Sequence, residues 1–175
     1  GAGLRLRTQP LRAAIEPSPS GRRIMPVEYD LTMDRAGCRV DERSSNAPMI
    51  NGSVPGPVLR LKEGQEAILR VTNRMEEETS IHWHGLLVPP EQDGVPGFNY
   101  DPIQPGETFT YRFDVKQAGT YWYHSHTGTQ EQEGMYAALV IDPAAPDPVA
   151  YDREHIIVLS DWTDEDPMSV LRNLK

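Results

Sequence analysis

The chain has 175 residues, a formal net charge of −9 and 38% hydrophobic residues, which is enough for one domain with part of a second. The acidic charge argues against a nucleic-acid partner, and no apolar run approaches the roughly 20 residues that a membrane-spanning helix requires. Cys38 is the only cysteine, which excludes an internal disulfide, and we interpret it as a free thiol near a turn.

The elements that the sequence predicts are short strands joined by turns. Residues 1–23 are expected to form an extended, solvated N-terminal arm. The 14 glycines and 16 prolines are then spread between short runs rich in Val, Ile, Leu, Thr, Tyr and Phe, which is typical of an all-β sandwich or barrel. The strands predicted within a domain at 24–143 cover residues 25–33, 58–61, 67–73, 76–87, 108–115, 119 onward and 135–143, with a long loop at 88–107.

The composition changes after residue 143. A connector rich in proline and charge is followed by a predicted strand at 155–162 and by a helix with Asp164 or Asp166 as its cap and Pro167 in its first turn. Because the sequence ends inside that helix, we interpret residues 144–175 as a linker and the start of a second domain, and we expect the protein to continue.

Four of the five histidines form two H-x-H pairs, His82 with His84 in "HWH" and His124 with His126 in "HSH". Residues at i and i+2 of a strand point to the same face, so each pair presents two imidazoles on one surface. Imidazole is a preferred ligand for copper, zinc, iron and nickel. Four of them without a carboxylate partner fit metal binding better than acid–base catalysis, whereas His155 stands alone and is interpreted as a surface or structural histidine.

Other segments contain sequence motifs that resemble those of a known family. "NGSVPGP", "RVTNR", "SIHWHG", "DGVPG", "QPGETFTYRF", "GTYWYHSHTG" and "IIVLSDW" occur in an order and spacing that resemble the N-terminal cupredoxin domain of multicopper oxidases. "GTQEQEGMY", "DPVAYDREH" and "SDWTDEDP" resemble the bacterial copper-resistance members of the CopA/PcoA type. The resemblance runs from about residue 24 to residue 175 and implies a cupredoxin-like Greek-key β-sandwich.

The resemblance also implies an activity and a set of ligands. Such enzymes couple the oxidation of Cu(I) or phenolic compounds to the reduction of O₂ to water, at a three-copper cluster shared between their first and last domains. By position, His82 would bind the type 2 copper, His84 and His124 one copper of the type 3 pair, and His126 the other. Zinc would be a possible substitute, because it also binds imidazole readily.

Asp93 and the aromatic residues beside the histidines each allow a structural explanation as well as a functional one. Asp93 stands where the family has an acidic residue near the cluster, which implies a role in orienting a ligand or donating protons, although an Asp-Gly turn is equally expected there. The aromatic residues beside the histidines are predicted to pack on the opposite face of the sheet; they are Trp83, Tyr121, Trp122 and Tyr123.

The chain lacks parts that the family requires. A blue-copper site needs two histidines and a cysteine together, but the family's "HCH" motif and its other H-x-H pair are absent, and Cys38 cannot substitute. We therefore expect a half-site that binds metal without oxidase activity, completed by the remaining domains or by another chain, with metal-mediated self-association possible. A stand-alone copper-sequestering module is the alternative. The family implies export to the periplasm by a signal that this chain does not contain.

Overall fold

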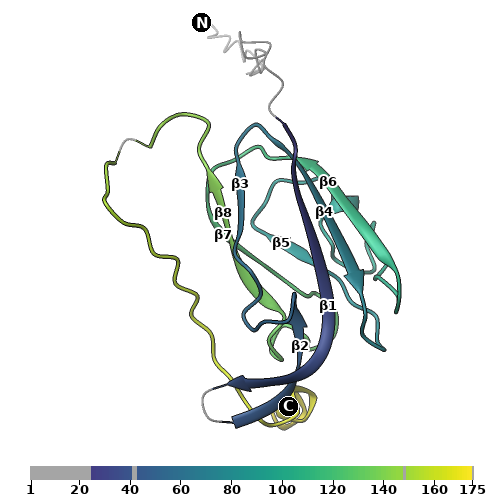
Figure 1. Ribbon diagram of the computed structural model, residues 1–175. Coiled ribbons are helices and arrows are strands. Elements are labelled where there is room, and N and C mark those ends of the chain that lie inside the picture. The colour runs from purple at the N-terminus through teal and green to yellow at the C-terminus, as the bar shows by residue number, and fades with distance from the viewer. Residues whose placement is uncertain (1–24, 41–42, 148, 175) are drawn as a thin grey trace, which may run out of the picture.

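The structure, a computed structural model that describes residues 25–40, 43–147 and 149–174, contains two four-stranded sheets packed face to face (Figure 1). The first sheet has the strand order β2-β1-β4-β6 and the second the order β3-β8-β7-β5. The strands are β1 (Val27–Val40), β2 (Arg43–Ile50), β3 (Leu59–Lys62), β4 (Glu66–Asn73), β5 (His82–His84), β6 (Thr108–Asp114), β7 (Gly119–His124) and β8 (Tyr136–Asp142). The arm predicted at 1–23 lies outside the described residues.

The chain changes sheet repeatedly as it proceeds. β3 and β4 follow each other in sequence but lie in different sheets, as do β6 and β7. The β1–β4 and β3–β8 pairs are parallel, and the remaining pairs are antiparallel. Two facing sheets joined by such crossings form a β-sandwich, so the predicted all-β sandwich is confirmed.

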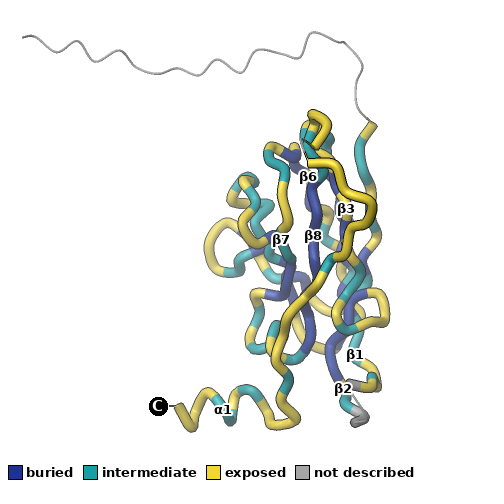
Figure 2. The backbone as a smooth tube through the Cα atoms, turned by 90° about the vertical axis from the view of Figure 1, so that its left-hand side faces the viewer, coloured by how far each residue is buried: buried dark blue, intermediate teal, exposed yellow. Residues whose placement is uncertain are grey.

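Alternating side chains fill the space between the sheets. Leu31 and Met33 of β1 are buried in one core cluster with Leu69 of β4 and Leu139 of β8, as the alternation in sequence predicted. β8 is buried on both faces from Tyr136 onward, and Figure 2 shows it dark blue along most of its length. The nearly continuous apolar run of β8 therefore reflects a strand covered on both sides.

The hairpin partner of β1 was not predicted from the sequence. β2 pairs antiparallel with the second half of β1, in a register that places Met33 opposite Ile50. Its residues are RSSNAPMI, which include three small polar side chains and Pro48. Proline cannot donate to a strand ladder and is tolerated at the edge of a sheet, and β2 is one of the two edge strands of its sheet.

The strand predicted at 155–162 is wrong. These residues form no strand ladder in the structure, and the side chains of Ile157 and Leu159 are 78% and 90% exposed. The segment crosses the outer face of β8, held by a hydrogen bond of 2.6 Å from Tyr136 Oη to Ser160 Oγ. An apolar run is compatible with a strand, but it does not show whether a neighbouring strand is present to pair with it.

The helix at the end of the chain begins where the sequence indicated. α1 (Pro167–Asn173) has Asp166 as its N-cap, whose carboxylate accepts hydrogen bonds from the backbone N–H groups of Met168 and Ser169. Asp166, rather than Asp164, is therefore the cap. No helix within the described ranges is long and apolar enough to cross a membrane. The domain boundary placed between residues 143 and 144 stays a prediction.

A buried tyrosine of β6 supports the start of β5. The hydroxyl of Tyr111 accepts a hydrogen bond of 3.2 Å from the backbone N–H of Ile81 and lies 2.6 Å from the hydroxyl of Tyr100. Ile81 directly precedes the first histidine of "HWH". The contact therefore fixes the backbone on which His82 is mounted.

Replacing Tyr111 with phenylalanine tests this support. The change leaves the buried N–H of Ile81 without its acceptor, which typically costs about 1–3 kcal/mol, so we expect the free energy of unfolding to fall by that amount in a denaturant titration. The control is Tyr151→Phe, which alters an exposed tyrosine and should change stability by less than about 0.5 kcal/mol. Equal effects of the two changes would contradict a structural role for this hydroxyl.

Candidate metal centre

The two H-x-H segments lie side by side in the second sheet. β5 and β7 pair antiparallel, with His82 opposite His124 and His84 opposite Trp122. His126 follows two residues after the end of β7. Alternation along the strands points Trp83 and Tyr123 into the core, where both are fully buried. The histidines consequently share the other face of the β5–β7 pair.

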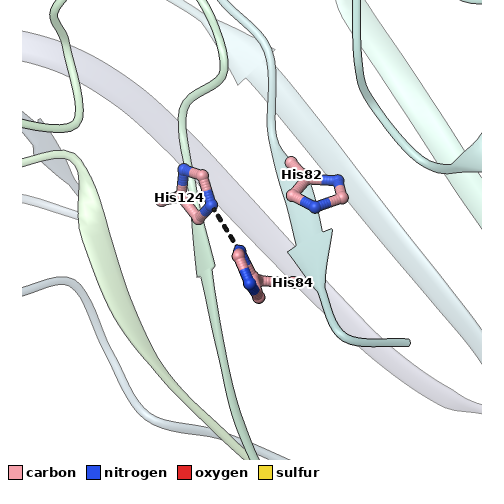
Figure 3. Close-up of side chains that lie close together, drawn as sticks. All are labelled: His82, His84 and His124. Carbon is pink, nitrogen blue, oxygen red and sulfur yellow. Dashed lines mark hydrogen bonds between the residues drawn. The ribbon is translucent and has the colours of Figure 1, made fainter.

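The four imidazoles converge as the sequence predicted. The ring centre of His82 lies 5.5 Å from that of His84, 5.4 Å from that of His124 and 5.6 Å from that of His126. One ring nitrogen from each of His82, His84 and His124 lies within 4.8 Å of the others, and Figure 3 shows these three rings facing a common space. His126 stands at the margin, with its ring centre 6.2 Å from that of His124.

The spacing of two ring nitrogens fits a shared metal ion. His84 Nδ1 lies 3.2 Å from His124 Nε2. Two nitrogens that are each about 2.0–2.1 Å from one ion lie about 3 Å apart. Imidazole nitrogen suits both copper and zinc. The donor set therefore fits a metal centre, with His124 buried, His82 half-buried, and His84 and His126 exposed at the surface.

The surroundings of His124 leave its Nε2 available to a metal. Its Nδ1 lies 2.9 Å from the carbonyl oxygen of Ser125 and 2.8 Å from a carboxylate oxygen of Glu131, so this nitrogen carries the proton. Burial lowers the pKa of His124 to about 4, against the opposing effect of the hydrogen bond to Ser125. A neutral ring with its proton on Nδ1 presents a free lone pair on Nε2.

Asp93 lies where the sequence placed it, next to the first histidine. Its backbone carbonyl oxygen is 2.8 Å and its carboxylate Oδ1 3.2 Å from His82 Nδ1. The following residue, Gly94, has φ +72°, and a Cβ there would clash with the carbonyl oxygen of Ile81. The Asp-Gly pair is therefore both a turn and a close contact that brings Asp93 to the histidine.

Buried polar side chains connect the two histidine segments. The hydroxyl of Ser80 accepts a hydrogen bond of 3.0 Å from the backbone N–H of His126. The hydroxyl of Ser125 donates to Gln130 Oε1 at 2.7 Å, and the same oxygen accepts from Thr79 Oγ1 at 2.8 Å. Satisfied buried networks of this kind hold a backbone rigidly, so both pairs are mounted on a fixed support.

The aromatic neighbours divide between the two faces of the sheet. Trp83 and Tyr123 are buried in the core and Tyr121 packs against it, as predicted. Trp122 does not: its ring stacks on His84 and His124, with centres 4.7 Å and 4.1 Å away. Trp122 is two residues before His124 and thus shares its face, a signal that was present in the sequence.

Two other candidates lie apart from this cluster. His155 is exposed in the segment after β8, in agreement with a surface histidine, and Cys38 is a free cysteine in β1.

The sequence did not indicate Glu131 as a residue of the site, because its contact with His124 arises from the turn between β7 and β8, and no spacing rule in the sequence predicts it.

Comparison with known protein sequences gives one family model and several relatives that agree with it. A family model described as multicopper oxidase matches residues 32–146. Copper resistance protein A from Escherichia coli is 52% identical over 157 residues, which are 90% of this chain and 26% of that protein. Copper resistance protein A from Pseudomonas syringae pv. tomato is 49% identical over 173 residues, 99% of this chain and 28% of that protein.

Solved structures agree with the sequence relatives. A multi-copper oxidase from Pseudomonas thermotolerans gives a TM-score of 0.67 at 34% identity, over 71% of this chain and 31% of that one. A laccase from Botrytis aclada gives 0.64 at 41% identity, over 67% of this chain and 22% of that one. These matches confirm the predicted cupredoxin-like fold, while the chain spans little more than a quarter of the relatives' length, 26% and 28% for the two above.

Single substitutions test whether the cluster binds metal. We expect His84→Ala and His124→Ala each to weaken Cu(II) binding by at least about 10–100-fold, the loss that removing a mere supporting group produces. Affinity is measured by competition with a chelator of known strength. His155→Ala should bind like the unaltered chain. Equal weakening by His155→Ala, or none by the other two, would place the metal elsewhere.

Proposed function

The chain belongs to the multicopper oxidase family, and we propose that it forms the N-terminal domain of a copper-dependent oxidase and supplies half of the histidine ligands of its copper cluster. One observation carries the proposal: the β5–β7 register gathers the imidazoles of His82, His84 and His124 on one face, and the ring of His126 lies beside them, its centre 5.6 Å from that of His82. Because relatives at about half identity are named copper resistance protein A, we extend the proposal to a role in copper resistance.

We assign the ligands as the resemblance to the family implies, and the spacing of one pair of nitrogens supports the assignment. His84 through Nδ1 and His124 through Nε2 would hold one copper of a type 3 pair, since these atoms are 3.2 Å apart. His126 would bind the other copper of the pair and His82 the type 2 copper. These residues would hold copper, which would transfer to O₂ the electrons that the reductant supplies. Zinc could occupy the same imidazoles, which do not discriminate strongly between the two metals.

Asp93 has two proposed tasks in this domain. By accepting from His82 Nδ1 through both its carbonyl and its carboxylate, it keeps the proton on that nitrogen and turns Nε2 toward the cluster. Its carboxylate is 36% exposed, so it can also exchange protons with water. Reduction of O₂ consumes protons, and a carboxylate beside a ligand is placed to deliver them.

The reductant and the remaining ligands would be provided outside this chain. The sequence contains one cysteine and five histidines and no "HCH" motif, so the type 1 site that receives electrons from Cu(I) or a phenolic compound must lie in further domains or in another chain. The exposed edges of His84 and His126 are accessible to such a partner, or to a second copy joined through metal. We also propose that the protein acts in the periplasm, as the resemblance to the copper-resistance oxidases implies.

A copper-sequestering module is the second candidate. Three imidazole nitrogens within 4.8 Å of one another are enough to hold one ion without ligands from another chain. This candidate needs neither a reductant nor O₂. The two candidates therefore differ in whether the chain supports O₂ consumption once the missing ligands and the type 1 site are supplied.

Measurements with an oxygen electrode test the oxidase proposal. We expect the copper-loaded 175-residue chain to bind copper, to show no intense blue absorption and to consume no O₂ with Cu(I) or a phenol, because a type 1 site is missing. Adding a chain that carries the complementary histidines and the type 1 site should produce consumption, which His84→Ala should abolish. Continued absence of consumption in that mixture, with copper bound, would favour the sequestering module. Consumption by the chain alone would contradict the half-site.

A further inference from the structure

Glu131 makes a contact with the cluster that the assignment of ligands does not use. Its Oε2 lies 2.8 Å from His124 Nδ1, and its side chain is 34% exposed while that of His124 is 5% exposed. The residue belongs to the turn between β7 and β8, seven positions after the histidine it touches. Its carboxylate therefore reaches back to the buried side of the ring, opposite the nitrogen that faces His84.

The same arrangement occurs at the other histidine segment. His82 Nδ1 faces a carbonyl oxygen at 2.8 Å and a carboxylate oxygen at 3.2 Å, both from Asp93. His124 Nδ1 faces the carbonyl oxygen of Ser125 at 2.9 Å and the carboxylate of Glu131 at 2.8 Å. His82 and His124 are direct cross-strand partners. Among the described residues these two are the histidines that pair with a carboxylate.

The turn that carries Glu131 is itself held in place. The neighbouring Gln130 is buried and joins Ser125 to Thr79 through its side-chain oxygen, while its amide donates to the carbonyl of Glu78 at 2.9 Å. Within the turn, the N–H of Gly134 donates to the carbonyl of Glu131 at 3.1 Å. These hydrogen bonds fix the backbone that carries Glu131. Less conformational entropy is therefore lost when its carboxylate contacts His124.

We propose that Glu131 is a positioning residue for His124: its carboxylate accepts the Nδ1 proton and holds the ring in the tautomer and orientation that present Nε2 to the metal. This inference rests on the proposed copper-binding function of His124. A carboxylate behind a ligating histidine fixes the tautomer and increases the basicity of the ligand nitrogen. Asp93 and Glu131 are then equivalent supports, one for each H-x-H segment.

The tautomer of His124 in the metal-free chain gives the first test. Long-range proton–nitrogen spectra at neutral pH should show the unaltered His124 with a protonated Nδ1 and a bare Nε2. In Glu131→Ala only the Ser125 carbonyl remains as acceptor, so we expect a measurable fraction of the ring to move its proton to Nε2. Glu131→Gln retains an acceptor oxygen and should restore most of the original form.

Zinc affinity gives the second readout. Zn(II) is used because it is diamagnetic and binds imidazole, and we expect Glu131→Ala to weaken it about 10–100-fold, with a smaller loss in Glu131→Gln. The matched control is Glu133→Gln. Glu133 lies in the same turn but pairs with Arg35 at 2.9 Å and with Thr129 Oγ1 at 3.0 Å, so it should leave both the spectrum of His124 and the affinity unchanged.

The outcomes separate this inference from the proposed function. An unaltered tautomer in Glu131→Ala together with unchanged zinc affinity would overturn the positioning role while leaving metal binding intact. An equal loss in Glu133→Gln would overturn it as well, since the cause would be the turn and not the contact. If the unaltered chain bound neither Cu(II) nor Zn(II) while the tautomer still depended on Glu131, the proposed copper-binding function would fail, and only the control of the His124 tautomer by Glu131 would stand.

Discussion

The pairing of β5 with β7 is the constraint on which the site depends. With His82 opposite His124, the period of two along β5 brings His82, His84 and His124 to one face, and His126 follows two residues after β7 ends. A slip of one residue would turn every side chain of β5 over. Trp83 opposes this slip, because its ring is fully buried against Tyr111 and Tyr123, with centres 5.1 Å and 5.7 Å away. The core of the sandwich thereby fixes the register of the histidines.

Hydrogen bonds to Nδ1 of two of the histidines determine which ring nitrogens carry the lone pairs that can bind a metal. His82 and His124 each direct Nδ1 at a carbonyl and a carboxylate, which turns Nε2 of both rings toward the common space, where Nε2 of His124 lies 3.2 Å from His84 Nδ1. Burial lowers the pKa of His124 to about 4, so protons compete little for this nitrogen at neutral pH. Metal ligands must be deprotonated, and the site is organised for that condition before any ion binds.

Much of this arrangement could be predicted from the sequence, because it rests on local periodicity. The H-x-H spacing alone indicated that His82 would share a face with His84 and His124 with His126. The family resemblance pointed to Asp93, although an Asp-Gly turn alone was equally expected there. The face of Trp122 follows from the same period of two, because Trp122 lies two residues before His124 in β7.

The remaining features depend on partners that lie far apart in the sequence. The contact between Glu131 and His124 requires the turn between β7 and β8 to fold back, and no sequence period encodes this. β2 was missed because Pro48 and its polar neighbours are compatible with a strand only at a sheet edge. Residues 155–162 have a strand-like composition but gain no ladder partner in the described chain. Propensity describes a segment, whereas pairing is a property of the whole fold.

We infer that the β5–β7 register forms a metal site before the ion arrives. The most direct measurement is a crystal structure of the copper-loaded chain, with anomalous scattering used to locate copper. The account predicts a copper peak bonded to His84 Nδ1 and His124 Nε2, with His82 still opposite His124 and its Nδ1 still directed at Asp93. Copper bound elsewhere, or bound only after these strands change register, would contradict it.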